Sequence, residues 1–118
     1  MTRAFIRLPS FEKQCGSMGL DEDDVIEIEN VILSNPKIGA VIKGTGGVRK
    51  FRMALSNNKG KSGGARIVYI DFAVYEKVYL ITAFPKGVKE NLSKAEQNEL
   101  KALVKVLESE CKKGRNGT

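Results

Sequence analysis

The sequence predicts an α+β fold. One antiparallel sheet, made of a three-strand C-terminal meander plus an N-terminal strand, is expected to carry N-terminal helices and a C-terminal helix packed on one face. Three runs rich in β-branched and aromatic residues follow one another at 48–55, 65–72 and 77–84 with short connections, which is typical of an antiparallel meander. Apolar residues recur at helical spacing before and after these runs. With 118 residues, 42% of them apolar, the chain is expected to form a single domain over residues 1–118.

The N-terminal third of the chain is expected to be mainly helical. Residues 4–8 alternate loosely ahead of a proline and predict a short first strand. A first helix is expected over residues 11–16, or on to residue 19, where glycines end it. Asp21 is predicted to cap a second helix that reaches about Ser34. The apolar face of this second helix is Val25, Ile28 and Ile32.

Two further helical segments are predicted from local signals. Asn35 followed by Pro36 favours a short helical turn that runs to residue 42 and stops at the glycines near Gly44. Residues 93–96, Ser-Lys-Ala-Glu, form a capping box that opens the C-terminal helix, and the polar tail 112–118 is expected to fray. The glycines at 44–47 have a purely structural interpretation, in which they end the preceding helical turn and provide the positive φ needed at the start of the following strand.

The charge is concentrated in the middle of the chain. Between Lys43 and Ile70 there are seven basic side chains and no acidic one, whereas residues 21–29 alone hold six of the fourteen carboxylates. A focused positive field of this kind attracts polyanions, so the block predicts a nucleic-acid surface. A sheet edge protected by lysines is the alternative interpretation. The seven basic residues are Lys43, Arg49, Lys50, Arg52, Lys59, Lys61 and Arg66.

Composition excludes several classes of chemistry. The chain has no histidine, so Ser-His-Asp and Cys-His catalysis are excluded, and its two distant cysteines, Cys15 and Cys111, predict neither a metal site nor a disulfide. Residues 60–62, Gly-Lys-Ser, lack the earlier glycine and the following helix of a phosphate-binding P-loop. With no membrane-length apolar run and no signal-peptide pattern, a cytoplasmic protein without membrane or cofactor is expected.

Two motifs together resemble a known family. Gly-Thr-Gly-Gly-Val-Arg-Lys at 44–50 and Gly-Gly-Ala-Arg at 63–66, with matching stretches at 35–39, 78–86 and 91–93, look like the RelE/ParE superfamily of bacterial toxins, specifically its HigB-like branch. The resemblance covers about residues 25–108. It implies a RelE-like fold and a toxin of a type II toxin–antitoxin system. Its members are similar to endoribonucleases that cut mRNA in the ribosomal A site and thereby inhibit translation.

The resemblance also implies partners and a mechanism. The partners are the ribosome with its mRNA and a cognate antitoxin, expected to be a helix-turn-helix protein of the HigA type. The implied reaction is attack of a ribose 2′-hydroxyl on the adjacent phosphate, which leaves a cyclic phosphate and a free 5′-hydroxyl. Such a reaction needs a proton acceptor, a proton donor to the leaving group and cations around the phosphate, but no metal or other cofactor.

Four basic residues are candidates for catalysis. Arg66 matches the family's strand arginine, whose planar fork can hold two phosphate oxygens. Lys50 and Arg52 are two residues apart on the preceding strand and project from one face, and crowding by other cations would favour a neutral Lys50 that acts as base. Lys86 matches the family's basic residue after the last strand. The candidate RNA-binding residues are Arg49, Lys59, Lys61 and Lys43.

One departure from the family leaves the acid and base open. RelE members carry a tyrosine near the C-terminus, but here the three tyrosines, Tyr69, Tyr75 and Tyr79, all lie on or between predicted strands. A strand tyrosine or a lysine could take that role, or the chain could be slow or inactive. Two other functions also remain open: a ParE-like gyrase poison, which has no need of a phosphate cradle, and a noncatalytic nucleic-acid-binding module.

Overall fold

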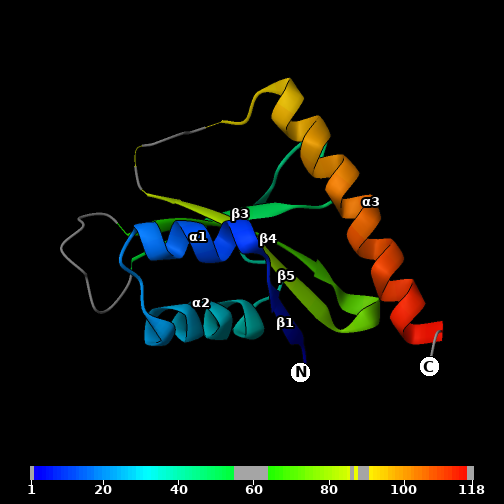
Figure 1. The fold of residues 1–118 in the computed structure, drawn as a ribbon, viewed down its shortest axis with the longest axis horizontal. Helices are drawn as coiled ribbons and strands as arrows, with labels where there is room; N and C mark the ends of the chain where they lie inside the picture. The colour runs from blue at the N-terminus through cyan, green and yellow to red at the C-terminus, as the bar shows by residue number, and fades with distance from the viewer. Residues whose placement is uncertain (1, 55–63, 86, 88–90, 117–118) are drawn as a thin grey trace.

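The fold is a five-stranded sheet with three helices, seen here in a computed structural model that describes residues 2–54, 64–85, 87 and 91–116 (Figure 1). The strand order is β1-β5-β4-β3-β2. The α+β class is therefore confirmed. The elements are β1 Ala4–Arg7, α1 Pro9–Ser17, α2 Glu22–Ser34, β2 Ala40–Val41, β3 Arg49–Met53, β4 Ala65–Phe72, the 3₁₀ turn η1 Ala73–Tyr75, β5 Lys77–Pro85 and α3 Lys94–Asn116.

The predicted meander is present, but the sheet as a whole is mixed. β3, β4 and β5 pair antiparallel in chain order. β1 instead lies parallel to β5, with Ala4 opposite Lys77. The two strands can run in the same direction because both helices and the rest of the meander lie between them in the chain, which gives ample length for a crossover. The prediction of a wholly antiparallel sheet is therefore wrong for the N-terminal strand.

The helical turn predicted from Asn35 to Ile42 is also wrong. Asn35 ends α2, residues 36–39 form a turn, and Ala40–Val41 pair with β3 as the short edge strand β2. Tertiary hydrogen bonds explain the difference. The buried Tyr69 hydroxyl donates to the carbonyl oxygens of Ile38 at 2.7 Å and Pro36 at 3.0 Å, so these groups are held by β4. The local helix signal of Asn-Pro is outweighed by these contacts.

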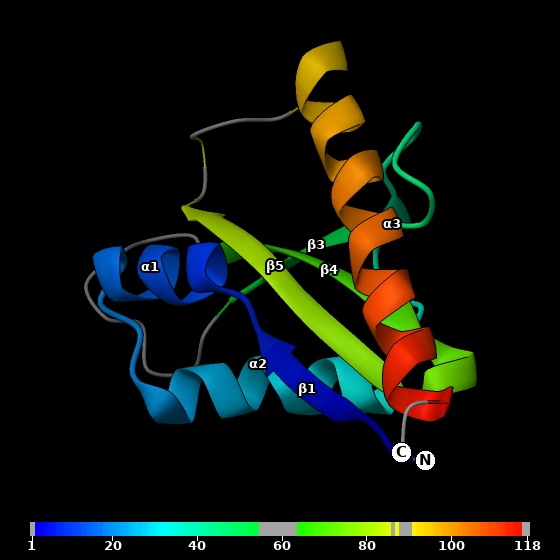
Figure 2. The same ribbon diagram turned by 45° about the vertical axis from the view of Figure 1, so that its right-hand side comes forward.

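The helices cover both faces of the sheet, where one covered face was predicted. Buried residues of α1 and α2 pack with Phe51, Ile67 and Tyr69 in one core, whereas α3 packs with Val68 and Ile70 in another. α3 accordingly runs well apart from α1 and α2 (Figures 1 and 2). The reason is that β4 is buried on both sides from Ala65 to Ile70, and each apolar face needs its own cover.

Both predicted helix starts are confirmed by their capping hydrogen bonds. The Asp21 side chain accepts from the Asp24 amide, and the Asp24 carboxylate accepts from the Asp21 amide. The same reciprocal pair joins Ser93 and Glu96 ahead of α3. α1 begins at Pro9, slightly earlier than predicted, and α3 continues into the polar tail as far as Asn116. No helix in the described part of the chain is long and apolar enough to cross a membrane.

The glycine-rich loop at 43–47 joins β2 to β3. Buried Thr45 holds it closed, since its hydroxyl donates to the Ile42 carbonyl at 2.7 Å and accepts from the Val48 amide at 3.1 Å. Three of its glycines have positive φ, including +80° at Gly44, which confirms the prediction that the chain needs this backbone conformation where it enters the following strand. The predicted helix stop does not apply, because β2 precedes the loop. Gly44 lies against Gln97, so the loop packs on α3.

The protonated Tyr69 hydroxyl is expected to stabilise the fold at neutral pH and to lose this effect in alkali. Burial raises the pKa of Tyr69 from an ordinary 10.0 to about 12. Because the pKa is higher in the folded state, the protonated hydroxyl contributes its full stabilisation at pH values below the pKa of the unfolded state. This contribution is lost as the pH rises through the pKa of the folded state. We therefore expect Tyr69→Phe to lower the free energy of unfolding by about 1 kcal/mol at neutral pH. The gap to wild type should narrow between roughly pH 10 and 12.

Urea unfolding of both proteins at neutral pH and at about pH 11 measures this gap. The comparison with Tyr69→Phe cancels the titration of the lysines, which both proteins share. A gap that stays constant into alkali would show that the hydroxyl ionises as freely in the folded protein as in the unfolded chain.

Candidate active site

Three of the predicted site residues come together on one face of the sheet. Arg52 of β3 lies directly opposite Arg66 of β4, and Lys50 lies opposite Val68 in the same ladder. Alternate residues of a strand share a face, so Lys50 and Arg52 stand on the same side as Arg66 and Val68. Val68 belongs to the core under α3, which assigns the trio to the α3 side of the sheet. We call Lys50, Arg52 and Arg66 the basic row.

The basic row runs from a buried charge to an exposed one. Arg66 is only 5% exposed, Lys50 is half-buried and Arg52 is exposed. Like charges directly opposite one another in a sheet are unfavourable, and burial of a guanidinium adds a desolvation cost. A phosphate placed between these groups would offset both terms. The arrangement therefore suits an anion that approaches from the Arg52 side and reaches inward to Arg66.

A glycine at the start of β4 sets the register of the row. Gly64 has φ +72°, and a Cβ on it would collide with the backbone of Met53 and Ala54. Only a residue without a side chain lets the two strands approach so closely just before the first pair, Met53 with Ala65. The next pair in the ladder is Arg52 with Arg66. The Gly-Gly-Ala-Arg motif thus has a structural reason for its second glycine.

Other predicted RNA-binding residues lie outside the row. Arg49 points to the opposite face from Lys50, and its Nη1 donates to the carbonyl oxygens of Lys37 at 3.0 Å and Gly39 at 3.1 Å. Arg49 therefore holds the turn before β2. Lys43 is exposed in the glycine-rich loop, away from the ladder. Lys59, Lys61 and Lys86 lie outside the described residues.

The tyrosines are poorly placed to act as acid or base. Tyr69 is fully buried on the α1/α2 side, and burial raises its pKa to about 12. Tyr79 is buried under α3 within 3.6 Å of the Cys111 sulfur, and burial, with that hydrogen bond, raises its pKa. Tyr75 lies in η1, at the far end of β4 from Arg66. Of the alternatives left open by the sequence, the geometry favours a lysine.

The structure adds two neighbours to which the sequence assigned no role. Phe84 of β5 is the cross-strand partner of Arg66, and Asn91 lines a small hollow together with Lys50 and Arg66. Phe84 was part of the strand pattern, but only the register between β4 and β5 could show which residue stands beside Arg66. Asn91 belongs to the stretch before the α3 capping box that matches the family, but the sequence assigned it no role.

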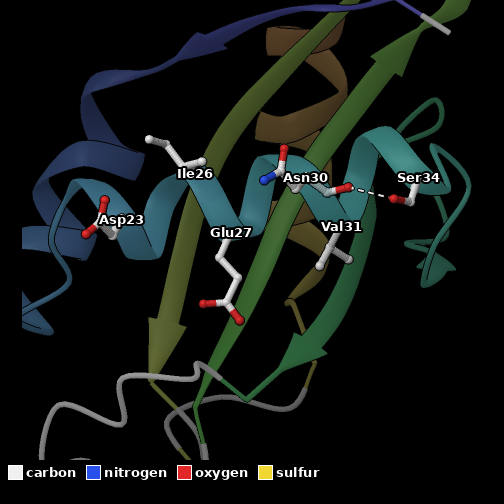
Figure 3. A pocket seen from close by; sticks show the side chains of 6 residues that line it. All are labelled: Asp23, Ile26, Glu27, Asn30, Val31 and Ser34. Carbon is white, nitrogen blue, oxygen red and sulfur yellow. Dashed lines mark hydrogen bonds between the residues drawn. The ribbon is translucent and has the colours of Figure 1, made fainter.

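A second hollow lies on the outer face of α2 and is a poor place for a phosphate. Figure 3 shows the side chains that line it, with Ser34 Oγ donating to the Asn30 carbonyl at 3.0 Å. Two of its side chains are the carboxylates Asp23 and Glu27, which would repel an anion. Among the described residues, no group of three or more Asp, Glu or Cys side chains is placed to hold a metal ion.

Comparisons with known proteins identify the family and the fold of the chain. A family model described as the RelE toxin of the RelE/RelB toxin–antitoxin system matches residues 25–115. Among solved structures, the chain is similar to a double mutant of the E. coli toxin RelE in the free state, with a TM-score of 0.51 and 16% sequence identity. That match covers 86% of this chain and 96% of the other. At this identity the structural likeness shows a shared fold.

The close approach at Gly64 predicts a large effect of a single methyl group. Gly64→Ala should destabilise the protein through both its positive φ, worth about 1–2 kcal/mol, and the backbone collision. Gly19→Ala is a matched control, because Gly19 has φ +74° and nothing within 4 Å of an added Cβ. Urea unfolding of both variants separates the two effects. Equal losses of stability would mean that β3 and β4 can separate at Gly64 without cost.

Proposed function

Since the chain belongs to the RelE toxin family, whose members are the toxins of toxin–antitoxin systems, we propose that it is a ribosome-dependent endoribonuclease that cuts mRNA in the A site and so inhibits translation. The observation that carries the proposal is the Arg52–Arg66 pair with Lys50 on the same face. Two guanidinium groups and an ammonium group on one face of the sheet can serve as a cradle for a phosphate that gains charge in a transition state.

The proposed reaction is attack of the ribose 2′-oxygen on the adjacent phosphorus, with loss of the 5′-oxygen of the next nucleotide. Arg66 holds two phosphate oxygens through its fork, and its burial keeps the surroundings low in dielectric, where such contacts are strongest. Arg52, at the exposed end of the row, neutralises the phosphate as it enters. The role of Arg66 is therefore stabilisation of charge, while that of Arg52 includes docking.

Lysines are the proposed proton carriers. Lys50, two residues from Arg52, accepts the proton of the 2′-hydroxyl, and Lys86 is assigned the protonation of the leaving oxygen. The assignment of Lys50 is supported by its place beside Arg66 in one hollow and by the distant positions of the three tyrosines. Lys86 lies outside the described residues and is proposed on the family motif alone. Lys43, Lys59 and Lys61 are proposed as RNA contacts on charge alone.

The partner of a RelE-family toxin is an antitoxin. We propose that the antitoxin of this chain is a helix-turn-helix protein, as expected for the HigB-like branch that the Gly-Thr-Gly-Gly-Val-Arg-Lys motif favours. The gyrase-poison alternative receives no support from the row, because inhibition by binding a protein does not require clustered, partly buried cations on one ladder.

Replacement of Arg66 should greatly slow cleavage with little change of fold. We expect Arg66→Ala to cut mRNA on the order of 10²-fold or more slowly, the usual cost of losing one donor to a transition-state oxyanion. Arg66→Lys should be intermediate, since it keeps the charge but loses the fork. Lys13→Ala, an exposed position on α1, is the control for a change of net charge. Growth inhibition and the rate of mRNA cleavage are the measurements, with thermal unfolding to check the fold.

The requirement for the ribosome is tested with purified components. The protein should leave free RNA largely intact and should cut mRNA on translating ribosomes, with new 5′ ends that carry hydroxyl groups. Mapping of 5′ ends after induction in cells gives the same answer in vivo. Rapid cleavage of free RNA that stops with EDTA would refute both the mechanism and the need for the ribosome. Growth arrest without new 5′ ends would favour a binding poison instead.

A further inference from the structure

We propose that the outward face of α3 is a binding surface for the phosphate backbone of base-paired RNA. Exposed lysines form this surface, and they lie outside the basic row. The surface holds RNA and takes no part in its cleavage, so the inference rests on the proposed function only in its choice of RNA as the polyanion. We call the residues of this surface the α3 lysine row: Lys94, Lys101, Lys105 and Lys112.

The spacing of the α3 lysine row places its members on one line along the helix. Successive members are seven, four and seven residues apart. An α-helix completes a turn in about 3.6 residues, so every member lies within about 20° of the direction of Lys94. At about 1.5 Å per residue, the row is about 27 Å long. All of these side chains are exposed, so α3 presents a straight line of ammonium groups to the solvent.

Carboxylates leave most of this positive charge uncompensated. Glu99 and Glu110 lie about 140–160° around the helix from the row, and among the glutamates of α3 Glu108 is the one close to it. None of the row's lysines forms an ion pair with a residue that the structure describes. Lys101 and Lys105 are four residues apart, a spacing at which like charges repel along a helix. A bound polyanion would offset this repulsion.

The way α3 packs leaves this face open. Leu103, Leu107 and Cys111 pack in the core between α3 and the sheet. α3 forms one side of the molecule in both views of the fold (Figures 1 and 2). Because the apolar residues of α3 are already used in this core, the helix has no apolar face to bury in a lipid bilayer. An anionic membrane is therefore a poorer partner than a nucleic acid.

The α3 lysine row begins close to the basic row. Leu92, two residues before Lys94, lines the same small hollow as Arg66. The glycine-rich loop brings a further cation to this end of the helix, since Gly44 lies against α3 and the exposed Lys43 directly precedes it. Cations therefore continue from β3 and β4 onto α3. RNA bound along the row would lie next to the strand that the basic row is proposed to cut.

The chemistry of the α3 lysine row suits the backbone of an RNA duplex. The lysine ammonium is a compact point charge, and contacts of this kind to phosphates position a protein without reading the sequence. α3 carries no aromatic side chain, so it offers no platform on which the bases of a single strand could stack. Double-stranded RNA is recognised mostly by its shape and by contacts to its backbone. A straight line of lysines matches that kind of recognition.

The test measures the binding of an RNA duplex that cannot be cut. The probe has about 16 base pairs, the span of a typical protein module on double-stranded RNA, and its riboses are 2′-O-methylated so that no 2′-hydroxyl can attack. Fluorescence anisotropy gives its affinity for the purified protein at several salt concentrations. Replacing two members of the row together, Lys101→Gln and Lys105→Gln, should reduce the slope of log affinity against log salt by about two. At about 0.1 M salt the affinity should fall on the order of tenfold or more.

Matched variants separate the α3 lysine row from the net charge. Lys13→Gln with Lys37→Gln removes the same charge from exposed positions on α1 and in the turn before β2, and should leave the slope unchanged. The glutamates give a test of opposite sign. Glu108→Gln, next to the row, should tighten binding of the duplex, whereas Glu99→Gln, on the other side of α3, should not. Glutamine is a good helix former, so α3 tolerates these changes.

Equal losses of affinity in the two double variants would show that net charge alone attracts RNA, and would overturn the proposal. It would also be overturned if a single strand with the same number of phosphates bound as tightly as the duplex. Equal competition by polyglutamate of the same charge would point to an acidic protein partner and refute the choice of RNA. Failure of the nuclease proposal has a different signature, which is the absence of new mRNA 5′ ends. The two proposals can therefore fail independently.

Discussion

The arrangement of this protein depends on the burial of β4 on both of its faces. Ile67 and Tyr69 point to one side, Val68 and Ile70 to the other, and all four are buried. A strand of this kind cannot lie on the surface, so α1 and α2 must cover one face and α3 the other. Once both faces are covered along the middle of the sheet, the polar residues that remain for function lie where β4 begins, at Arg66.

This constraint also explains the distribution of charge. At the β1 end of the sheet the cations are paired with carboxylates: Arg3 contacts Asp71 at 2.7 Å, and Arg7 contacts Glu22 at 2.8 Å and Glu29 at 2.9 Å. These ion pairs tie β1 to β4 and to α2. The basic row at the other end of β4 places cation opposite cation instead. A bound anion would reduce the repulsion between these two guanidinium groups.

Local patterns predicted what local forces decide. The meander, the Asp21 cap, the Ser93–Glu96 capping box and the shared face of Lys50 and Arg52 all follow from residues close together in the chain. The parallel pairing of β1 with β5 joins distant residues, and no local pattern contains it. The edge strand β2 was mistaken for a helical turn because Tyr69 and Arg49 hold its preceding carbonyls from another part of the fold. The continuous apolar run of β4 did indicate that both faces of this strand are buried, and therefore that α3 could cover the face opposite to α1 and α2.

The parallel pairing of β1 with β5 has a consequence for how the chain acquires its shape. β1 is made before the other strands, but its partner is β5, so the sheet cannot be completed until β5 has been synthesised. Contacts between residues so far apart in the chain form slowly, whereas the β3–β4 pair is local. During synthesis, β1 must wait unpaired while the strand that will hold it is still being made. The ribosome must therefore synthesise α1, α2 and the three strands β2, β3 and β4 before the partner of β1 exists.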